Sequence, residues 1–374
     1  MVIVYITLFA GALFVLQKYL YRRYWQKGVE VKLAFAEEMV MAREEANLLE
    51  IVENHKYLPL PSLKVKFQCS RHLVFRDAQN SAVTDKYYRN DLFSVMPYKR
   101  ITRSHKVYCP KRGYYTIYGI DLVGADLFFS EEMVGERDSG TFLYVLPAPV
   151  EAGFLEDALK KINGEIAVRR YELEDPFTYR GIREYQPHDE MKKVNWKATA
   201  RTGDLKVNVR EHTAVKNVRI FLNLSDRSIL RREELLEMCI SICFELVKEL
   251  MAQGIEISVY ANAGDCLSGR ILQMEERGTN AGLADIGRAL ARLDIEEKVS
   301  DFAECFREKL FAEKDLYTIF LSSERHDEFQ ELLCEYRKKG DFTWLCPVKD
   351  MEEDSILEEL RKCTLLLQHE DGKK

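Results

Sequence analysis

The feature that most constrains this chain is an uncharged run near its N-terminus. Residues 2–17 read VIVYITLFAGALFVLQ, and residues 19–21 extend the run to roughly 20 mostly apolar positions. A helix of that length is long enough to cross the hydrocarbon core of a bilayer. A secretory signal peptide would need a charged stretch before the run and a small-residue cleavage site after it, and neither is present. We therefore expect residues 1–22 to form a retained transmembrane anchor.

The residues after this run predict where the rest of the chain lies. The segment KYLYRRYWQK starts at Lys18 and carries Arg22, Arg23 and Lys27. Because cytoplasmic flanks are rich in Lys and Arg, this collar predicts a single-pass protein of the cell membrane with the bulk of the chain in the cytoplasm. The nine cysteines, without any C-x-x-C spacing, also favour a reducing compartment.

Length and charge narrow the function classes. With 374 residues the chain can hold two domains, each with a substantial core. It carries 55 Lys and Arg against 61 Asp and Glu, a net charge of −6, so no global basic balance suggests a nucleic-acid binder. Any basic surface must be local.

The hydrophobic pattern divides the remaining chain into two parts. Residues 29–147 contain short runs rich in β-branched and aromatic residues, separated by turn-forming pieces such as PKRG, which predicts an antiparallel β-sandwich. From residue 215 to 370, wholly apolar runs alternate with amphipathic helices, which indicates a doubly wound parallel sheet. Residues 148–214 read as a connector between them. The expected fold class is α+β multidomain: transmembrane helix, β-sandwich, then an α/β doubly wound domain.

One stretch in the connector is dense with unusual neighbours. The run Arg183–Asn208 reads REYQPHDEMKKVNWKATARTGDLKVN, and upstream lie CPKRGYYTIYGIDLVGADLFF and DPFTYRG. Together these elements closely resemble the hallmark of the domain-of-unknown-function 58 (DUF58) family. His188 occupies the position where that family usually has Gly, and His is one of the side chains better tolerated at positive φ. The signature residues that the resemblance implies are Arg183, Tyr185, Pro187, Asp189, Trp196, Ala200 and Arg201.

The resemblance implies a membrane-tethered bacterial protein with a β-sandwich followed by a von Willebrand factor A-like domain. It also implies association with MoxR-type AAA+ ATPases and with transglutaminase-like membrane proteins. No enzymatic activity or cofactor is implied.

The metal-binding form of the von Willebrand-like domain places oxygen ligands after its strands. Here the corresponding positions hold Asn223, Ser225 and Arg227, with Thr279 further on and a third position among residues 322–324. An amide in place of a carboxylate and a guanidinium at the site both disfavour a divalent cation, so we predict no bound metal. Asp226 is the one neighbour that could restore a shifted site, and this alternative stays open.

Three interpretations of the signature stretch follow from its residue types. As a brace between the domains, Pro187 and Asp189 would form a turn and Trp196 would be a buried anchor. Arg183 and Arg201 would reach carboxylates such as Asp189 or Glu184, with Asp189 and Arg201 as the candidate pair. As an anion-binding surface, it would use the excess of positive charge between residues 180 and 219, where there are ten Lys and Arg but only five Asp and Glu. As a hydrolase, it would use His188 and Asp189, although no known nucleophile motif accompanies them.

The brace interpretation leads to our functional expectation. We expect a non-enzymatic, membrane-anchored cytosolic scaffold or adaptor that docks a protein such as a MoxR-type ATPase. The alternatives are metal-dependent adhesion through the von Willebrand-like domain and hydrolysis at His188 and Asp189.

Overall fold

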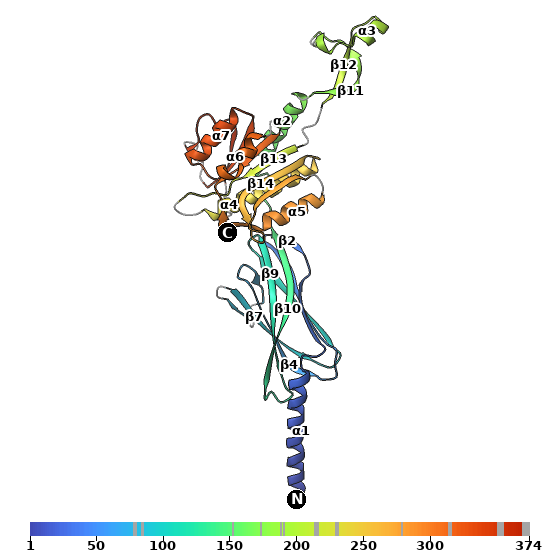
Figure 1. Cartoon of the computed structure of the whole chain (residues 1–374), viewed down its shortest axis with the longest axis vertical. Coiled ribbons are helices and arrows are strands. Elements are labelled where there is room, and N and C mark those ends of the chain that lie inside the picture. The colour runs from blue at the N-terminus through green and yellow to red at the C-terminus, as the bar shows by residue number, and fades with distance from the viewer. Residues whose placement is uncertain are drawn as a thin grey trace. The chain divides into compact units, whose positions relative to one another are not determined.

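A computed structural model describes residues 1–77, 81–83, 86–151, 153–172, 174–187, 189, 191–212, 217–228, 232–277, 280–312, 316–349 and 355–368. The chain is a mixed α/β protein with a body made mostly of sheet and an apolar N-terminal helix (Figure 1). It divides into two compact units, residues Met1–Pro149 with Leu290–Arg292, and residues Val150–Ala289 with Leu293–Lys374.

The N-terminal helix α1 spans Val2–Tyr24, and its mean hydropathy of 1.7 makes it long and apolar enough to span a membrane. Its side chains are exposed over the first four turns, but Gln17 and Tyr21 are buried against the first unit. The Tyr21 hydroxyl donates a hydrogen bond to the Pro59 carbonyl oxygen at 2.8 Å. The last turns of α1 are therefore fixed to the folded body.

Two sheets make up the body of the first unit. The four-stranded sheet has the order β1-β3-β8-β5, and the six-stranded sheet has the order β2-β10-β9-β4-β7-β6. All neighbours are antiparallel except β2 and β10, which are parallel. The strand bounds are β1 Val29–Phe35, β2 Met39–Met41, β3 Glu44–Asn54, β4 Leu60–Ser70, β5 Val74–Phe75, β6 Ser81–Val83, β7 Lys86–Val95, β8 Arg100–Cys109, β9 Gly113–Ala125 and β10 Glu132–Leu146.

The two sheets share one hydrophobic core. Burial alternates along the strands, as in β7, because successive side chains point to opposite faces of a sheet. Leu48 of β3, Leu63 of β4 and Ile117 of β9 are fully buried in the same cluster. Each such side chain contributes about 1.5–3 kcal/mol relative to an exposed one, so the alternating pattern fixes which face of each strand turns inward.

The second unit is built on a seven-stranded sheet. Its parallel part has the order β14-β13-β17-β18-β19, and β15 and β16 both pair antiparallel with β14. The bounds are β13 Asn217–Leu222, β14 Glu256–Asp265, β15 Ile271–Arg277, β16 Leu293–Val299, β17 Tyr317–Leu321, β18 Phe342–Val348 and β19 Thr364–Gln368. The parallel sheet agrees with the expectation, whereas β15 and β16 are antiparallel additions that the charged sequences ILQMEER and LDIEEKV did not suggest.

Helices cover the parallel strands. β17 and β18 are buried throughout, and β13 is buried from its second residue onward. Phe221, Phe320 and Trp344 pack in one cluster with side chains of α6 and α7. Because side chains alternate along a strand, Ile220 and Ile319 face the opposite side, and α4 contacts β13, β14 and β18. The helix bounds are α4 Glu233–Ala252, α5 Asn280–Ala291, α6 Phe302–Ala312 and α7 Asp327–Arg337.

The expected connector contains a helix and a separate two-stranded sheet. Helix α2 spans Glu156–Glu172 and buries Ala158, Ile162 and Ile166, as its apolar spacing predicts. Strands β11 (Glu174–Glu184) and β12 (Lys206–His212) are antiparallel. Between them lie the 3-10 helix η1 (Met191–Lys193) and helix α3 (Trp196–Thr202). We call β11, β12 and the segment between them the signature hairpin.

Candidate functional site

Asp189 organises the turn that follows β11. Its carboxylate accepts two hydrogen bonds from the Arg183 guanidinium, each 2.6 Å long, and a third from the Gln186 amide at 2.8 Å. The hydrogen bonds with Asp189 raise the pKa of Arg183. The candidate pair expected from the sequence was Asp189 with Arg201, whereas the structure places the Arg183 guanidinium on this carboxylate. Because these bonds occupy the Asp189 carboxylate, it is not poised as a general base; His188 lies outside the described residues.

Helix α3 is held at both ends. The Asn195 side chain accepts a hydrogen bond from the Ala198 amide at 2.9 Å and donates one to Asn208 Oδ1 on β12 at 2.7 Å. Gly203 ends the helix with a φ of 82°, a left-handed conformation that suits glycine. An N-cap side chain such as that of Asn195 contributes about 1 kcal/mol to helix stability. This helps α3 to form despite its length of only seven residues.

Large apolar side chains of the hairpin are in solvent. Trp196 is 62% exposed, and Ile182, Met191 and Leu205 are 55%, 56% and 40% exposed. The expectation that Trp196 is a buried anchor is therefore wrong. The reason is local: Trp196 is the first residue of α3, and the residue that is buried beside it is Val194, which bridges to Val207.

The hairpin also carries several cations. Lys192, Lys197 and Arg201 are exposed, and Lys193 is half-buried. The neighbouring acid Glu184 is neutralised by Lys206 at 3.0 Å. Of the other predicted signature residues, Pro187 and Ala200 are exposed, and Tyr185 is half-buried, with its amide donating to the Leu205 carbonyl oxygen. The hairpin thus carries exposed apolar side chains and exposed cations.

The predicted metal positions come together at a second place, at the carboxyl ends of β13 and β17. The chain runs from β13 to β14 on one side and then to β17 on the other, so the strand order reverses between β13 and β17. Open α/β sheets place ligand sites at such a reversal. We call the residues gathered there the carboxyl-edge cluster: Asn223, Ser225, Arg227, Asn262, Ser322 and Glu324.

Amide side chains bind this cluster together. Asn223 Nδ2 donates to Glu324 Oε2 at 2.8 Å and to Ser322 Oγ at 3.2 Å. Asn262 Nδ2 donates to Asn223 Oδ1, to Ser225 Oγ and to the Ser300 carbonyl oxygen, and its Oδ1 accepts from the Leu224 amide at 2.7 Å. The sequence analysis did not single out Asn262, although a polar residue directly after the last parallel pair of β14 was a usable signal.

Arg227 supplies the positive charge of this cluster. Its guanidinium contacts Glu324 at 3.5 Å and Asp301 at 2.9 Å, and it also pairs with Glu328. Burial raises the pKa of Glu324, and the hydrogen bond from Asn223 and the charge of Arg227 only partly offset this. The oxygens that a divalent cation would need are therefore already bound to Asn223 and Arg227.

The remaining candidate ligands are unsuited to a shifted metal site. Asp226 accepts hydrogen bonds from the Ser228 amide and hydroxyl and from the Arg232 amide. Burial alone would raise the pKa of Asp226, but these bonds outweigh it and lower the pKa. Asp226 thus shapes the turn before α4, while Thr279 lies outside the described residues.

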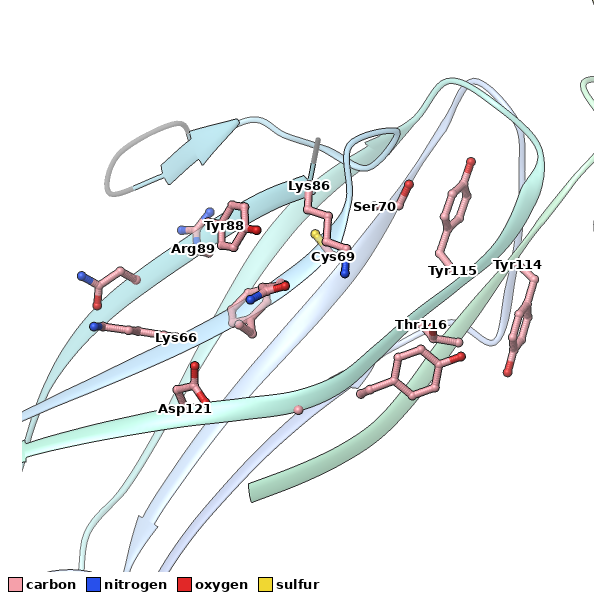
Figure 2. Close-up of a pocket in the computed structure, with 15 residues that line it drawn as sticks. Lys66, Cys69, Ser70, Lys86, Tyr88, Arg89, Tyr114, Tyr115, Thr116 and Asp121 are labelled. Carbon is pink, nitrogen blue, oxygen red and sulfur yellow. The ribbon is translucent and has the colours of Figure 1, made fainter. Parts of the chain in front are cut away.

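A groove in the first unit contains none of these predicted residues. It has a volume of ≈ 1140 Å³ and opens on the six-stranded sheet between β4 and β9, whose pairing stops at Phe67 and Ile120 (Figure 2). Lys66, Tyr88 and Asp121 lie along it. Its one thiol, Cys69, is 3% exposed, and burial raises its pKa to about 12, so it is not an activated nucleophile.

Comparisons with solved structures returned only low similarity scores. The CARDB domain of a Pyrococcus furiosus protein, solved with di-metal ions, is 16% identical over 31% of this chain and 90% of that chain, with a TM-score of 0.20. A non-cellulosomal cohesin from Archaeoglobus fulgidus is 12% identical over 35% of this chain and 97% of its own, with a TM-score of 0.21. The Bacillus subtilis sporulation control protein Spo0M is 10% identical and is covered over 58% of its length, which is 42% of this chain, with a TM-score of 0.19.

The sequence comparison is more informative. None of the curated proteins matches the chain. Residues 181–261, which include most of the signature hairpin and the strands β13 and most of β14, match the family described as "Protein of unknown function DUF58". This match supports the resemblance first seen in the signature stretch, and over these residues the chain is similar to the DUF58 family.

Proposed function

We propose that this protein is a non-enzymatic, membrane-anchored scaffold that docks a protein partner through the signature hairpin. The observation that supports this most is the 62% exposure of Trp196 on a helix whose ends are both fixed. Tryptophan and arginine dominate the binding energy of protein interfaces, and a rigid frame reduces the entropy lost on binding.

The chemistry of the hairpin defines the partner. Met191, Trp196 and Ile182 are exposed apolar side chains, and Lys192, Lys197 and Arg201 are exposed cations of the same hairpin. A complementary partner has an apolar pocket with acidic residues around it. On the resemblance to the DUF58 family, we propose a MoxR-type AAA+ ATPase in this role, with a transglutaminase-like membrane protein as a further component of the same assembly.

The other parts of the chain have supporting roles in this proposal. Helix α1 anchors the protein in the cell membrane, and its basic flank keeps the bulk of the chain on the cytoplasmic side. The first unit is a β-sandwich, and the second is a von Willebrand factor A-like domain whose carboxyl-edge cluster uses Arg227 in place of a metal ion.

Site-specific photo-crosslinking tests the proposal. The photoreactive residue benzoylphenylalanine replaces Trp196 in the full chain, and the matched control carries it at Leu267, which is 54% exposed in the same unit. We expect a crosslinked adduct with the MoxR-type ATPase of the same organism at position 196 and none at position 267. Equal adducts at both positions, or none at position 196 with the ATPase present, would refute docking through the hairpin.

A further inference from the structure

The first unit carries its own exposed apolar surface, at the turn between β9 and β10. Leu127, Phe128 and Phe129 follow one another there and are 46%, 61% and 66% exposed. Three consecutive large apolar residues in solvent are unfavourable for a soluble surface and mark a contact with a partner or a membrane. We call these three residues the aromatic turn.

The aromatic turn is fixed to the anchor helix. Asp126, the residue before the turn, accepts a 2.8 Å hydrogen bond from the Gln17 side chain of α1. The same carboxylate accepts hydrogen bonds from the Ser130 amide and hydroxyl, both 2.6 Å long, and so closes the turn. Phe129 has a φ of 55°, a conformation that costs energy for a bulky side chain and is retained where the surroundings enforce it. The hydrogen bonds of Asp126 therefore hold the turn in the conformation that exposes these rings.

The position of the turn along α1 sets its depth. The Phe128 ring lies 5.7 Å from the ring of Phe14, centroid to centroid, and Lys18 lies over that same Phe14 ring. A transmembrane helix needs about 20 residues to cross the hydrocarbon core. The mostly apolar run of residues 2–21 in α1 supplies that length, and Phe14 lies well inside it. Phe128 must lie at the same depth as Phe14.

A second set of exposed residues lies closer to the end of α1. The Lys56 ammonium donates to the Tyr24 carbonyl oxygen at 2.8 Å, which places the next residue, Tyr57, beside the helix end. Tyr57 is 83% exposed and Tyr98 is 56% exposed. The centroids of their two rings lie 4.9 Å apart. Tyrosine and tryptophan concentrate at the headgroup level of membranes, and Tyr24 is about 15 Å along the helix from Phe14.

We propose that the aromatic turn inserts into the lipid bilayer beside α1, with Tyr57 and Tyr98 at the headgroup level. The contact makes the first unit a membrane-seated base that cannot swivel freely about its anchor. Gln17 is consistent with this, because a polar side chain at membrane depth needs an internal partner and Asp126 provides one. The inference rests on the anchoring role proposed above for α1.

Lipid quenching of tryptophan fluorescence tests the insertion. The full chain is reconstituted in phosphatidylcholine nanodiscs with or without lipid brominated near the top of the acyl chains. Three variants are compared: Phe129→Trp in the aromatic turn, Tyr118→Trp on β9, and Leu8→Trp in α1. The fluorescence of the unmodified chain is subtracted from each. Tyr118 is a matched control because it is 73% exposed but lies roughly 25 Å along β9 from the turn.

We expect bromine to remove about half or more of the fluorescence added by Phe129→Trp and by Leu8→Trp, and none of that added by Tyr118→Trp. Quenching of Leu8→Trp without quenching of Phe129→Trp would refute the insertion and leave the anchor intact. If Leu8→Trp were not quenched either, the anchor itself would be refuted and the insertion with it. An unquenched Phe129→Trp that is shielded by a second copy of the chain would show as a dimer in the nanodisc, which would also refute insertion.

Discussion

The carboxyl-edge cluster and the signature hairpin both contain polar and charged side chains that are joined by hydrogen bonds. They differ in which side chains remain exposed to solvent. In the cluster, Asn223, Asn262 and Glu324 are buried and bind one another. In the hairpin, the Arg183–Asp189 pair and the Asn195 cap hold a frame whose largest side chain, Trp196, is in solvent.

The contrast separates stability from recognition. Buried polar groups that satisfy one another have little capacity left for a ligand, and removal of one leaves the others unpaired at a cost of about 1–3 kcal/mol each. An exposed tryptophan contributes little to folding and has its whole surface available to a partner. We therefore expect substitutions in the cluster to change stability and substitutions in the hairpin to change binding. The four predictions below test this division.

Asn262→Ala should have the largest effect on stability. It removes three donated hydrogen bonds and leaves the buried Leu224 amide without its acceptor. We expect a loss of about 3 kcal/mol in the free energy of opening of β13 and β17, measured by hydrogen exchange of the full chain in detergent. The exposed Asn90 is the control, and Asn90→Ala should change that free energy by less than about 0.5 kcal/mol. Equal effects would contradict the division.

Arg227→Ser should convert the cluster into a divalent-cation site. Without the guanidinium, the carboxylates of Glu324, Asp301 and Glu328 face one another with no cation between them, and oxygen donors of this kind suit Mg²⁺ and Mn²⁺. At ten times the dissociation constant, bound Mn²⁺ should stabilise the variant by about 1.4 kcal/mol, visible as a rise in Tm.

Arg227→Lys keeps the positive charge and is the matched control for this conversion. Neither it nor the unmodified protein should respond to Mn²⁺. A rise in Tm for the unmodified protein would show that Arg227 does not exclude a metal, and would favour the metal-dependent alternative.

These two regions also show what the sequence could and could not predict. The parallel sheet followed from runs such as YTIFL and FTWLCPV, because strands buried on both faces are apolar throughout. The positions Asn223, Ser225 and Arg227 came from the family resemblance, which implies a von Willebrand factor A-like domain with ligand positions directly after its first strand. The partners Asp301 and Glu328 come from segments more than 70 residues away, so no local pattern could reveal them.

The exposure of Trp196 had no sequence signal at all. A tryptophan among Pro, Asp and Arg has the composition of a packed joint and of a binding surface alike, because both use large rings and forked ion pairs. What decides is the segment before α3: Val194 bridges to Val207 and is buried, while Trp196, the first residue of α3, is exposed. Likewise, the charged strands β15 and β16 form because β14 offers them an edge, a tertiary effect that overrides their composition.

Glu324→Gln should change how stability depends on pH. Burial raises the pKa of Glu324, so the folded protein holds this proton more tightly than the unfolded chain does. The corresponding stability is present at low pH and is lost as pH rises through the raised pKa. The variant should lack this loss, so its stability relative to the unmodified protein should increase from acid to neutral pH in urea titrations. A parallel pH profile for the two proteins would show that Glu324 does not titrate in the folded state within this range.

Trp196→Ala should have the smallest effect on stability and the clearest effect on docking. Trp196 is 62% exposed, so its removal uncovers little buried surface. We therefore expect the free energy of opening of the β11–β12 sheet to change by less than about 0.5 kcal/mol. Binding to the ATPase partner should weaken at least tenfold, about 1.4 kcal/mol, in a titration with the full chain in nanodiscs.

The matched control is Arg183→Ala, which removes the ion pair with Asp189 and should loosen the hairpin itself, so that hydrogen exchange in β11 and β12 accelerates. If Trp196→Ala accelerated exchange as strongly as Arg183→Ala, the tryptophan would be part of the frame and not of the surface that the frame presents.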